Sequence, residues 1–301
     1  MSTILITGAA GGVGSLLRPR LARPGRTLRL LDLAELTAPG EPAAPTDAAS
    51  PAPAAPAPET ELTPETEPTP ETAPAEELVR ASVTDLDAMI EACQGVDAVI
   101  HLGGQATEAA WDRILEVNIH GTYTVFEAAR RAGVPRVVFA SSNHAVGFHT
   151  PAEYPLPENV TPLPDTYYGV SKVAGEGLGA LYAHRYGMDV ICVRILSCFP
   201  EPTALRSLST WLSPDDAGRL FEACITAPHP GFRIVYGVSA NTRGGWVSLE
   251  GARALGYEPR DDAEVYADKL TAEFGPLDPQ DPVFAHLGGP FCFPSLDAEN
   301  L

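Results

Sequence analysis

The chain has little positive charge. Its 301 residues include 20 lysines and arginines against 39 aspartates and glutamates, which gives a formal net charge of −19. Nucleic acids and anionic membranes are themselves negatively charged and would be repelled by such a surface, so we expect neither as a partner. A small-molecule partner fits this composition better.

Cysteine pairs and long apolar runs are also lacking. The five cysteines are odd in number and form no C-x-x-C pair, which argues against a disulfide framework and against a zinc site. We therefore expect no bound metal and reduced, mostly buried thiols at Cys93, Cys192, Cys198, Cys224 and Cys292. No apolar run approaches membrane-spanning length, and nothing near Met1 resembles a signal peptide, so the expected location is the cytoplasm.

Hydrophobic residues are scarce between Ala34 and Glu77, where Pro, Ala, Thr and Glu dominate and near-repeats such as TPETEPTPETAP occur. This segment holds ten acidic residues and no basic one. Like-charge repulsion and many prolines leave no apolar face to offset the cost of ordering the backbone, so we predict a disordered insertion over 34–77. A solvated insertion is favoured, and a role as a lid or a partner-binding tail stays open.

Outside that segment, short apolar runs alternate with helical patterns in a βαβ rhythm. With 45% hydrophobic residues, the sequence predicts a single α/β domain over 1–301, of Rossmann type, with a doubly wound parallel sheet and a small C-terminal substrate lobe. The expected strands are 3–7, 27–32, 78–81, 98–102, 136–141, 189–195 and 233–238. The expected helices are 12–22, 84–93, 111–132, 167–186 and 214–227, the first of them in conflict with Pro19.

A glycine-rich turn follows the first expected strand. The run TILITGAAGGVG places Gly8, Gly11 and Gly14 between that strand and a helix. Backbone N–H groups at a helix N-terminus can approach a pyrophosphate closely only where side chains are absent, and the helix dipole favours the negative charge. In this context the pattern predicts a dinucleotide site rather than a plain tight turn.

Asp32 ends the second expected strand. A carboxylate at this point can accept hydrogen bonds from the adenosine ribose hydroxyls and repel a 2′-phosphate. The position therefore favours NAD over NADP, and the alternative is an aspartate that only forms the turn.

Tyr168 and Lys172, in TYYGVSK, are four residues apart at the start of an expected helix and share one face of it. The chain contains only one other lysine, Lys269, against a background of arginines. A free phenol has a pKa of about 10, and an ammonium group together with an oxidised nicotinamide can lower it toward the neutral range. We interpret the two residues as a proton-transfer pair.

Polar residues also follow the expected strand that begins at Arg136. Ser142, Asn143 and His144 come at its C-terminal edge, where ligands of such sheets bind and where a serine hydroxyl can stabilise charge on a reacting oxygen. Capping of the strand end is the alternative. Asn118 lies within an expected helix among apolar neighbours, and we interpret it as a buried structural or water-organising residue.

In chain order, TGAAGGVG, Asp32, HLGG, Asn118, SSNH and YGVSK resemble the motifs of the extended short-chain dehydrogenase/reductase family, also known as the NAD-dependent epimerase/dehydratase family. More narrowly, FASSNHAVG, YYGVSK, SCFPEP, LSTWLSPDD and GVSANTRGGW are similar to the uronate dehydrogenases within it. The resemblance covers nearly the whole chain except the insertion. It implies an NAD-dependent homo-oligomer that oxidises galacturonate or glucuronate at the anomeric carbon to an aldarolactone.

The resemblance also implies roles for individual residues. The implied catalytic residues are Ser142, Tyr168, Lys172 and Asn118, the last supporting Lys172 through water. The implied cofactor-binding residues are Gly8, Gly11, Gly12, Val13, Gly14, Asp32, Ser82, Val83, Leu102, Gly103, Gly104, Asn118, Tyr168 and Lys172. The implied substrate-binding residues are Thr107, Ser142, Asn143, His144, Tyr168, Ser197 and Arg206. The planar guanidinium of Arg206 can bind the uronate carboxylate through two hydrogen bonds.

Two positions depart from the family pattern. Ser82 stands where an aspartate usually lies near the adenine, which either reduces the affinity for adenine or leaves that contact to the backbone of Val83. Ala106 stands where a substrate-facing serine is usual, with Thr107 as the substitute. A nucleotide-sugar epimerase or dehydratase of the same family is one alternative. A non-catalytic NAD-sensing regulator is another, although it would have no need for Tyr168 and Lys172.

Overall fold

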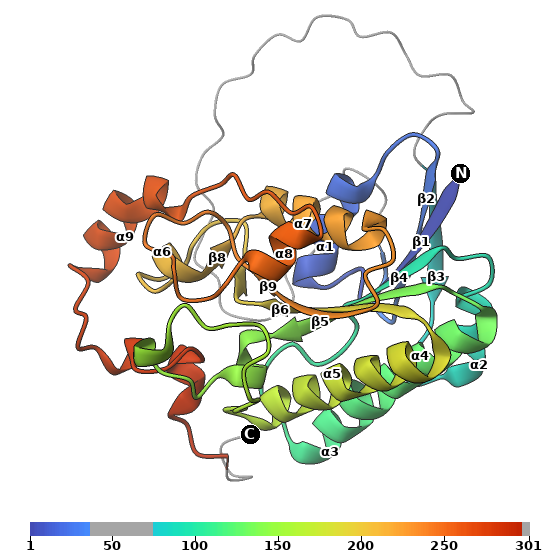
Figure 1. Ribbon diagram of the computed structural model, residues 1–301, viewed down its shortest axis with the longest axis horizontal. Coiled ribbons are helices and arrows are strands. Elements are labelled where there is room, and N and C mark those ends of the chain that lie inside the picture. The colour runs from blue at the N-terminus through green and yellow to red at the C-terminus, as the bar shows by residue number, and fades with distance from the viewer. Residues whose placement is uncertain (37–74, 297–301) are drawn as a thin grey trace, which may run out of the picture.

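The computed structural model describes residues 1–36 and 75–296 and contains a seven-stranded parallel sheet (Figure 1). The strands lie in the order β3-β2-β1-β4-β5-β6-β9. Their bounds are β1 Ser2–Thr7, β2 Arg26–Asp32, β3 Ala75–Arg80, β4 Ala98–His101, β5 Arg136–Ser142, β6 Asp189–Ile195 and β9 Phe232–Gly237. The strand order reverses between β1 and β4, so the doubly wound fold predicted from the sequence is confirmed.

Helices cover both faces of the sheet (Figure 1). One face carries α1 Gly12–Leu21, α7 Pro214–Thr226 and α8 Glu250–Ala254, and the other carries α2 Leu86–Ala92, α4 Gly121–Ala132 and α5 Tyr167–Tyr186. Alternate residues of β1 belong to the two cores: Ile4 and Ile6 pack with α1 and α7, and Leu5 packs with α2, α4 and α5. Because both faces of the central strands β4, β5 and β6 are buried, their sequences are nearly continuous apolar runs.

The predicted helix over 111–132 is divided into three parts, which corrects the expectation of one regular helix. A short turn α3, Trp111–Arg113, leads into a π-helical segment, Ile114–His120, and then into α4. The wider π turn directs Asn118 inward, where it is only 3% exposed. Irregular helical turns of this kind are frequent at functional sites.

The predicted insertion ends earlier than expected. Residues 75–77 belong to strand β3, where they pair with Thr27 to Arg29 of β2. Glu76 also pairs with Arg18 of α1 at 2.6 Å, and Glu77 with Arg29 at 2.6 Å. The acidic side chains that favoured disorder are thus neutralised by neighbouring arginines. Residues 34–36 are also described, and the rest of the predicted disordered segment, 37–74, lies outside the described residues.

The C-terminal part adds small elements beside the sheet (Figure 1). They comprise a two-stranded pair, β7 Ser197–Cys198 and β8 Trp211–Leu212, with the helices α6 Ser207–Thr210 and α9 Ala267–Phe274. Single 3₁₀ turns are Asn143–Val146, Pro151–Glu153, Ala263–Tyr266, Pro282–Phe284 and Gly289–Cys292. Pro19 lies in the last turn of α1, where it removes one backbone hydrogen bond, and the helix ends two residues later.

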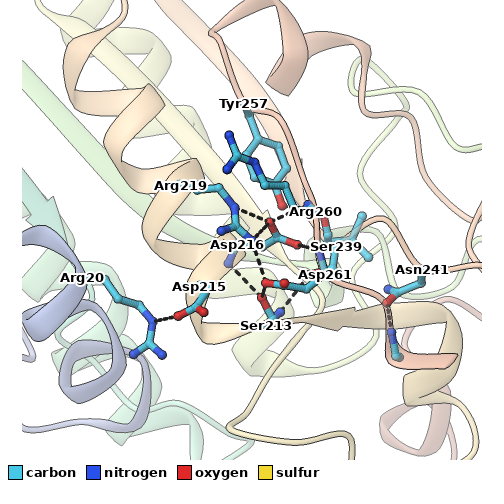
Figure 2. A network of polar contacts seen from close by, with 12 residues as sticks. Arg20, Ser213, Asp215, Asp216, Arg219, Ser239, Asn241, Tyr257, Arg260 and Asp261 are labelled. Carbon is cyan, nitrogen blue, oxygen red and sulfur yellow. Dashed lines mark hydrogen bonds and ion pairs between the residues drawn. The ribbon is translucent and has the colours of Figure 1, made fainter. Parts of the chain in front are cut away.

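A polar network anchors this part to α7 (Figure 2). The carboxylate of Asp216 is fully buried, pairs with Arg219, and accepts hydrogen bonds from the backbone N–H groups of Arg260 and Asp261 at 2.9 Å each. Ser213 caps α7 by accepting from the N–H of Asp216 at 2.8 Å. The motif LSPDD is therefore a helix-capping motif that docks the C-terminal part onto the sheet domain.

All five cysteines are free, and three of them, Cys93, Cys192 and Cys224, are buried. Over residues 1–36 and 75–296, none of the helices has the length and apolar character needed to cross a membrane.

Candidate active site

A cavity of about 960 Å³ runs along the C-terminal ends of the central strands. This volume is at the upper end of the range of about 300–1,000 Å³ for ligand sites. Every residue that the sequence placed in the cofactor or substrate site lines the cavity, with the single exception of Asn118. The structure thus brings together residues from the turn after β1, the ends of β2 and β3, the loop after β4, and helix α5.

The glycine turn is shaped for close approach by a ligand. Gly8 has a φ of +71°, and a Cβ on it would lie 2.6 Å from the backbone nitrogen of Gly103. A Cβ on Gly14 would lie 2.4 Å from the carbonyl oxygen of Gly8, whereas a Cβ on Gly12 would meet no atom within 4 Å. No side chain caps the N-terminus of α1 at Gly11, so its N–H groups face the cavity and can bind a pyrophosphate.

Asp32 is held in place at the same end of the cavity. One carboxylate oxygen accepts from the N–H of Ala10 and the other from the N–H of Ala34, each at 3.0 Å. A carboxylate has about four acceptor positions, so capacity remains for ribose hydroxyls. Nearby, the hydroxyl of Ser82 lies 2.8 Å from that of Thr84. These residues fit the adenosine half of a dinucleotide.

Tyr168, Ser142 and Lys172 meet beneath the middle of the cavity. The Ser142 hydroxyl donates to the side-chain oxygen of Asn143 at 3.3 Å, and its proximity to the Tyr168 hydroxyl lowers the pKa of the phenol. The Lys172 ammonium lies 5.2 Å from the centre of the Tyr168 ring and donates to the carbonyl of Ala140 at 2.8 Å. Among the described residues Lys172 thus bonds to the backbone of β5 rather than to the phenol, and its effect on Tyr168 is through space.

Burial shifts both titratable groups. Burial raises the pKa of Tyr168 to about 12, against the nearby hydroxyl of Ser142, which lowers it. Burial lowers the pKa of Lys172 to about 8, and the Glu176 carboxylate one helical turn away partly offsets this. The mechanism predicted from the sequence requires a phenol pKa near the neutral range, and the protein alone does not lower the pKa of Tyr168. Positive charge from a bound ligand is therefore needed as well.

Asn118 connects the loop after β4 to helix α5. Its side-chain oxygen accepts from the N–H of Gln105 at 2.7 Å, and its nitrogen donates to the carbonyl of Gln105 and to the hydroxyl of Ser171. Ser171 in turn donates to the carbonyl of Tyr168 at 2.6 Å. Both donors of the amide are thus used in structure, while its oxygen keeps one acceptor position. The support of Lys172 by Asn118 through water remains a prediction.

Arg206 lines the cavity beside the other predicted substrate residues, without an ion-pair partner among the described residues, and the charge of Asp165 acts on it only through space. It donates to the carbonyl of Leu287 and lies 5.1 Å from the centre of the Trp246 ring. Its Nε is buried without a hydrogen-bond partner, and no carboxylate of the described residues forms an ion pair with it. Burial lowers the pKa of Arg206 to about 10. A cation in these surroundings is suited to bind an anionic ligand.

The other predicted substrate residues surround the same end. Ser197 lies 3.0 Å from the hydroxyl of Thr210, and Thr107 accepts from the side chain of Gln105 at 3.3 Å. Asn143 donates to the carbonyl of Leu287 at 3.0 Å. The ring of His144 packs against Phe291 at 4.3 Å between centroids.

Several contacts were not foreseen from the sequence. Glu108 accepts from the N–H of Tyr168 at 2.8 Å, and Oδ2 of Asp165 lies 2.7 Å from Nδ1 of His144. Trp246 lies in GVSANTRGGW, a run already noted as distinctive, but nothing marked its contact with Arg206. The segment from Leu287 to Phe291 carries no recognisable motif and closes one wall of the cavity.

Comparison with known proteins agrees with this geometry. Residues 4–205 match the model of the NAD dependent epimerase/dehydratase family. The chain is 38% identical over 288 residues to a uronate dehydrogenase of Pseudomonas syringae pv. tomato, covering 96% of this chain and 92% of the relative. It is 43% identical over 218 residues to an NAD-dependent glucose-6-phosphate dehydrogenase of Haloferax volcanii, covering 67% and 81%. A crystal structure of a mutant uronate dehydrogenase from Agrobacterium tumefaciens complexed with NAD superposes with a TM-score of 0.80 at 37% identity, covering 97% of each chain.

Proposed function

The chain belongs to the NAD dependent epimerase/dehydratase family, and from that premise we propose that it is an NAD-dependent dehydrogenase of uronic acids. Its substrate is a hexuronic acid such as galacturonate or glucuronate, oxidised at the anomeric carbon to the aldarolactone. Similarity to uronate dehydrogenases over nearly the full chain supports this assignment.

The residues at the glycine turn fit the cofactor. The N–H groups at the start of α1 bind the pyrophosphate of NAD, and Asp32 binds the ribose hydroxyls. Ser82 and Val83 face the adenine. When bound, NAD supplies the acceptor for the hydride that leaves the anomeric carbon.

The substrate lies between Arg206 and Tyr168. Arg206 binds the carboxylate, which fixes the sugar ring, while Asn143, His144, Ser197 and Thr107 bind its hydroxyls. Ser142 donates a hydrogen bond to the anomeric oxygen, and ionised Tyr168 takes the anomeric hydroxyl proton as the carbon–oxygen double bond forms. Because the reacting group is a cyclic hemiacetal, its loss of a proton and a hydride gives a lactone directly.

The proposal rests mainly on the surroundings of Arg206. Its guanidinium lines the proposed substrate end of the cavity, and its buried Nε has no hydrogen-bond partner among the described residues. Placing an unbalanced cation among protein groups costs free energy unless an anion completes the site. A carboxylate in the planar orientation of a uronic acid meets this requirement, and a neutral sugar does not.

The test measures NADH formation by absorbance with galacturonate, glucuronate, the corresponding neutral hexoses, glucose 6-phosphate and UDP-glucose. We expect turnover with the uronates and little with the others. A preference for glucose 6-phosphate would instead assign the activity of the relative from Haloferax volcanii, and activity with UDP-glucose alone would favour the nucleotide-sugar alternative. Turnover of uronates and neutral hexoses at equal efficiency would contradict the role of Arg206.

Tyr168→Phe provides the control for the chemistry, since it removes one oxygen atom and keeps the ring. We expect loss of turnover with NAD still bound, measured by calorimetry.

The same proposal includes a cytoplasmic location and a homo-oligomeric state. Light scattering on the purified protein tests the oligomeric state.

A further inference from the structure

Asp165 is a buried carboxylate that the chemistry described above does not use. Its side chain is 0% exposed. Its Oδ2 lies 2.7 Å from Nδ1 of His144, and its Oδ1 accepts from the hydroxyl of Thr166 at 3.0 Å. Over the described residues no lysine or arginine forms an ion pair with it. Its nearest charged or titratable neighbour is the imidazole of His144, and its charge acts through space on Arg206 and Tyr168.

The surroundings fix the position of this carboxylate. A Cβ placed on Gly147 would lie 2.0 Å from Oδ2 of Asp165, and a Cβ on Gly288 would lie 1.8 Å from it. The sulfur of Cys292 lies 3.6 Å from the same oxygen. Two glycines from distant parts of the chain thus leave space for the carboxylate, which has no room to turn away from His144.

The contact determines where His144 carries its proton. An ionised carboxylate accepts hydrogen bonds and cannot donate them, so Nδ1 of His144 must be protonated. In a neutral imidazole the other nitrogen, Nε2, is then a hydrogen-bond acceptor. His144 lines the cavity, and no hydrogen bond between described residues engages its Nε2. The acceptor is therefore free for a ligand.

We propose that Asp165 is a positioning residue that holds neutral His144 with Nδ1 protonated, so that Nε2 accepts a hydrogen bond from a hydroxyl of the sugar. The nature of this ligand rests on the proposed function. Arg206 attracts the carboxylate, whereas an acceptor nitrogen repels it and binds a hydroxyl. Arg206 and His144 together determine the orientation in which the sugar acid binds.

Nitrogen-15 NMR of the histidines in the full chain tests this arrangement directly, with the His144 signals identified by their loss in His144→Phe. We expect the neutral tautomer protonated at Nδ1 at about pH 8. A tautomer protonated at Nε2, or a doubly protonated ring, would overturn the proposal. The measurement needs no substrate, so its result stands even if uronic acids fail as substrates.

Asp165→Asn gives a second test. Thr166 donates to Oδ1, so the asparagine keeps its oxygen there and presents its NH₂ group to His144. We expect the tautomer to change to protonation at Nε2, and the KM for the uronate to rise about ten-fold, as for one lost hydrogen bond, with the KM for NAD within about two-fold. Asp268→Asn, on the exposed side of α9, is the matched control and leaves both values unchanged.

A double variant shows whether Asp165 acts through His144. If it does, His144→Phe combined with Asp165→Asn has the same uronate KM as His144→Phe alone. Losses that multiply in the double variant would contradict the proposal, and so would a parallel rise in the KM for NAD. Thermal unfolding of each variant identifies any that fail to fold. In that case the NMR result on the unmodified chain alone supports or overturns the proposal.

Discussion

Lys172 illustrates a conflict between stability and activity at a single residue. Burial lowers its pKa from 10.5 to about 8, which opposes the charged form by about 3 kcal/mol. Between these two values the unfolded chain holds the proton on this lysine and the folded chain does not, so the group adds stability as the pH rises from about 8 to about 10.5. Below about pH 8 the folded protein bears the full free-energy cost of burying the charged lysine.

Lys172→Met should therefore stabilise the protein while abolishing activity. Methionine keeps most of the volume and carries no charge, so we expect a higher Tm than the unmodified chain at pH 7 without NAD. The advantage should shrink toward zero near pH 10.5, because the lysine of the folded chain is then neutral. Thermal scans across this pH range measure the difference. A lower Tm at pH 7, or a difference independent of pH, would contradict the account.

Arg206 should govern the binding of the substrate without affecting the cofactor. Removing a charge-assisted, two-point contact costs about 2 kcal/mol, so Arg206→Ala should raise the uronate KM about 30-fold, and Arg206→Lys should recover only part of this. The Kd for NAD, measured by calorimetry, should stay within about two-fold. Arg253→Ala, at an exposed arginine of α8, is the matched control. An unchanged KM in Arg206→Ala would remove the carboxylate-binding role.

At this scale the sequence predicted residues whose chemistry follows from a local pattern. The glycine turn, Asp32, Tyr168 and Lys172 each have a characteristic spacing, and all line the cavity. Asp165 and Glu108 could not be found in this way. Their roles depend on contacts across 21 and 60 residues of the chain, which only the folded backbone brings together.

The elements were predicted better than their boundaries. The seven strands and α5 follow from apolar periodicity, which both helix layers enforce by burying the sheet on two sides. The break between α3 and α4 left no trace in the sequence, because a π turn differs from an α turn by one residue in its hydrogen bonds. The start of β3 was missed because its acidic residues suggested solvent, whereas Arg18 and Arg29 bind them.

The cap of α7 gives a prediction for an element. Ser213 accepts from the N–H of Asp216 and donates to Asp261, so Ser213→Ala removes the helix cap and one link to the C-terminal part. We expect a loss of about 1 kcal/mol, or a fall of about 2 °C in Tm. Thr226→Ala, at the exposed far end of the same helix, is the control and should change Tm by less. Equal effects of the two variants would show that the cap contributes nothing beyond an ordinary hydroxyl.

For the whole molecule, the parallel pairing of β2 and β3 limits how far the intervening chain can be shortened. Thr27 pairs with Ala75 and Asp32 with Arg80, so β3 begins at the end of the sheet opposite to the end of β2. The connection must return along six residues of strand, about 20 Å. Parallel strands generally need about a dozen residues or more for such a crossover.

Deleting Ala38 to Pro74 outright leaves five residues, Leu33 to Thr37, between the two strands. Fully extended, they reach about 20 Å and have no slack to pass around the sheet. We expect this deletion to lower Tm and weaken the binding of NAD, and a version with a flexible linker of about twelve residues to restore both. Calorimetry and thermal scans measure the two effects. Full stability and affinity in the short version would contradict the crossover argument.

Strand β3 also shapes the energetics of cofactor binding. Among the described strands it lies at the edge of the sheet, is mostly exposed and is hydrogen-bonded only to β2, and such an element opens locally at low free energy. Ser82 and Val83 follow it directly at the adenine end of the cavity. If a dinucleotide bound there stabilises only the closed form, we expect amide hydrogen exchange in β3 to slow as NAD is added. In that case part of the intrinsic free energy of NAD binding holds β3 in its closed form.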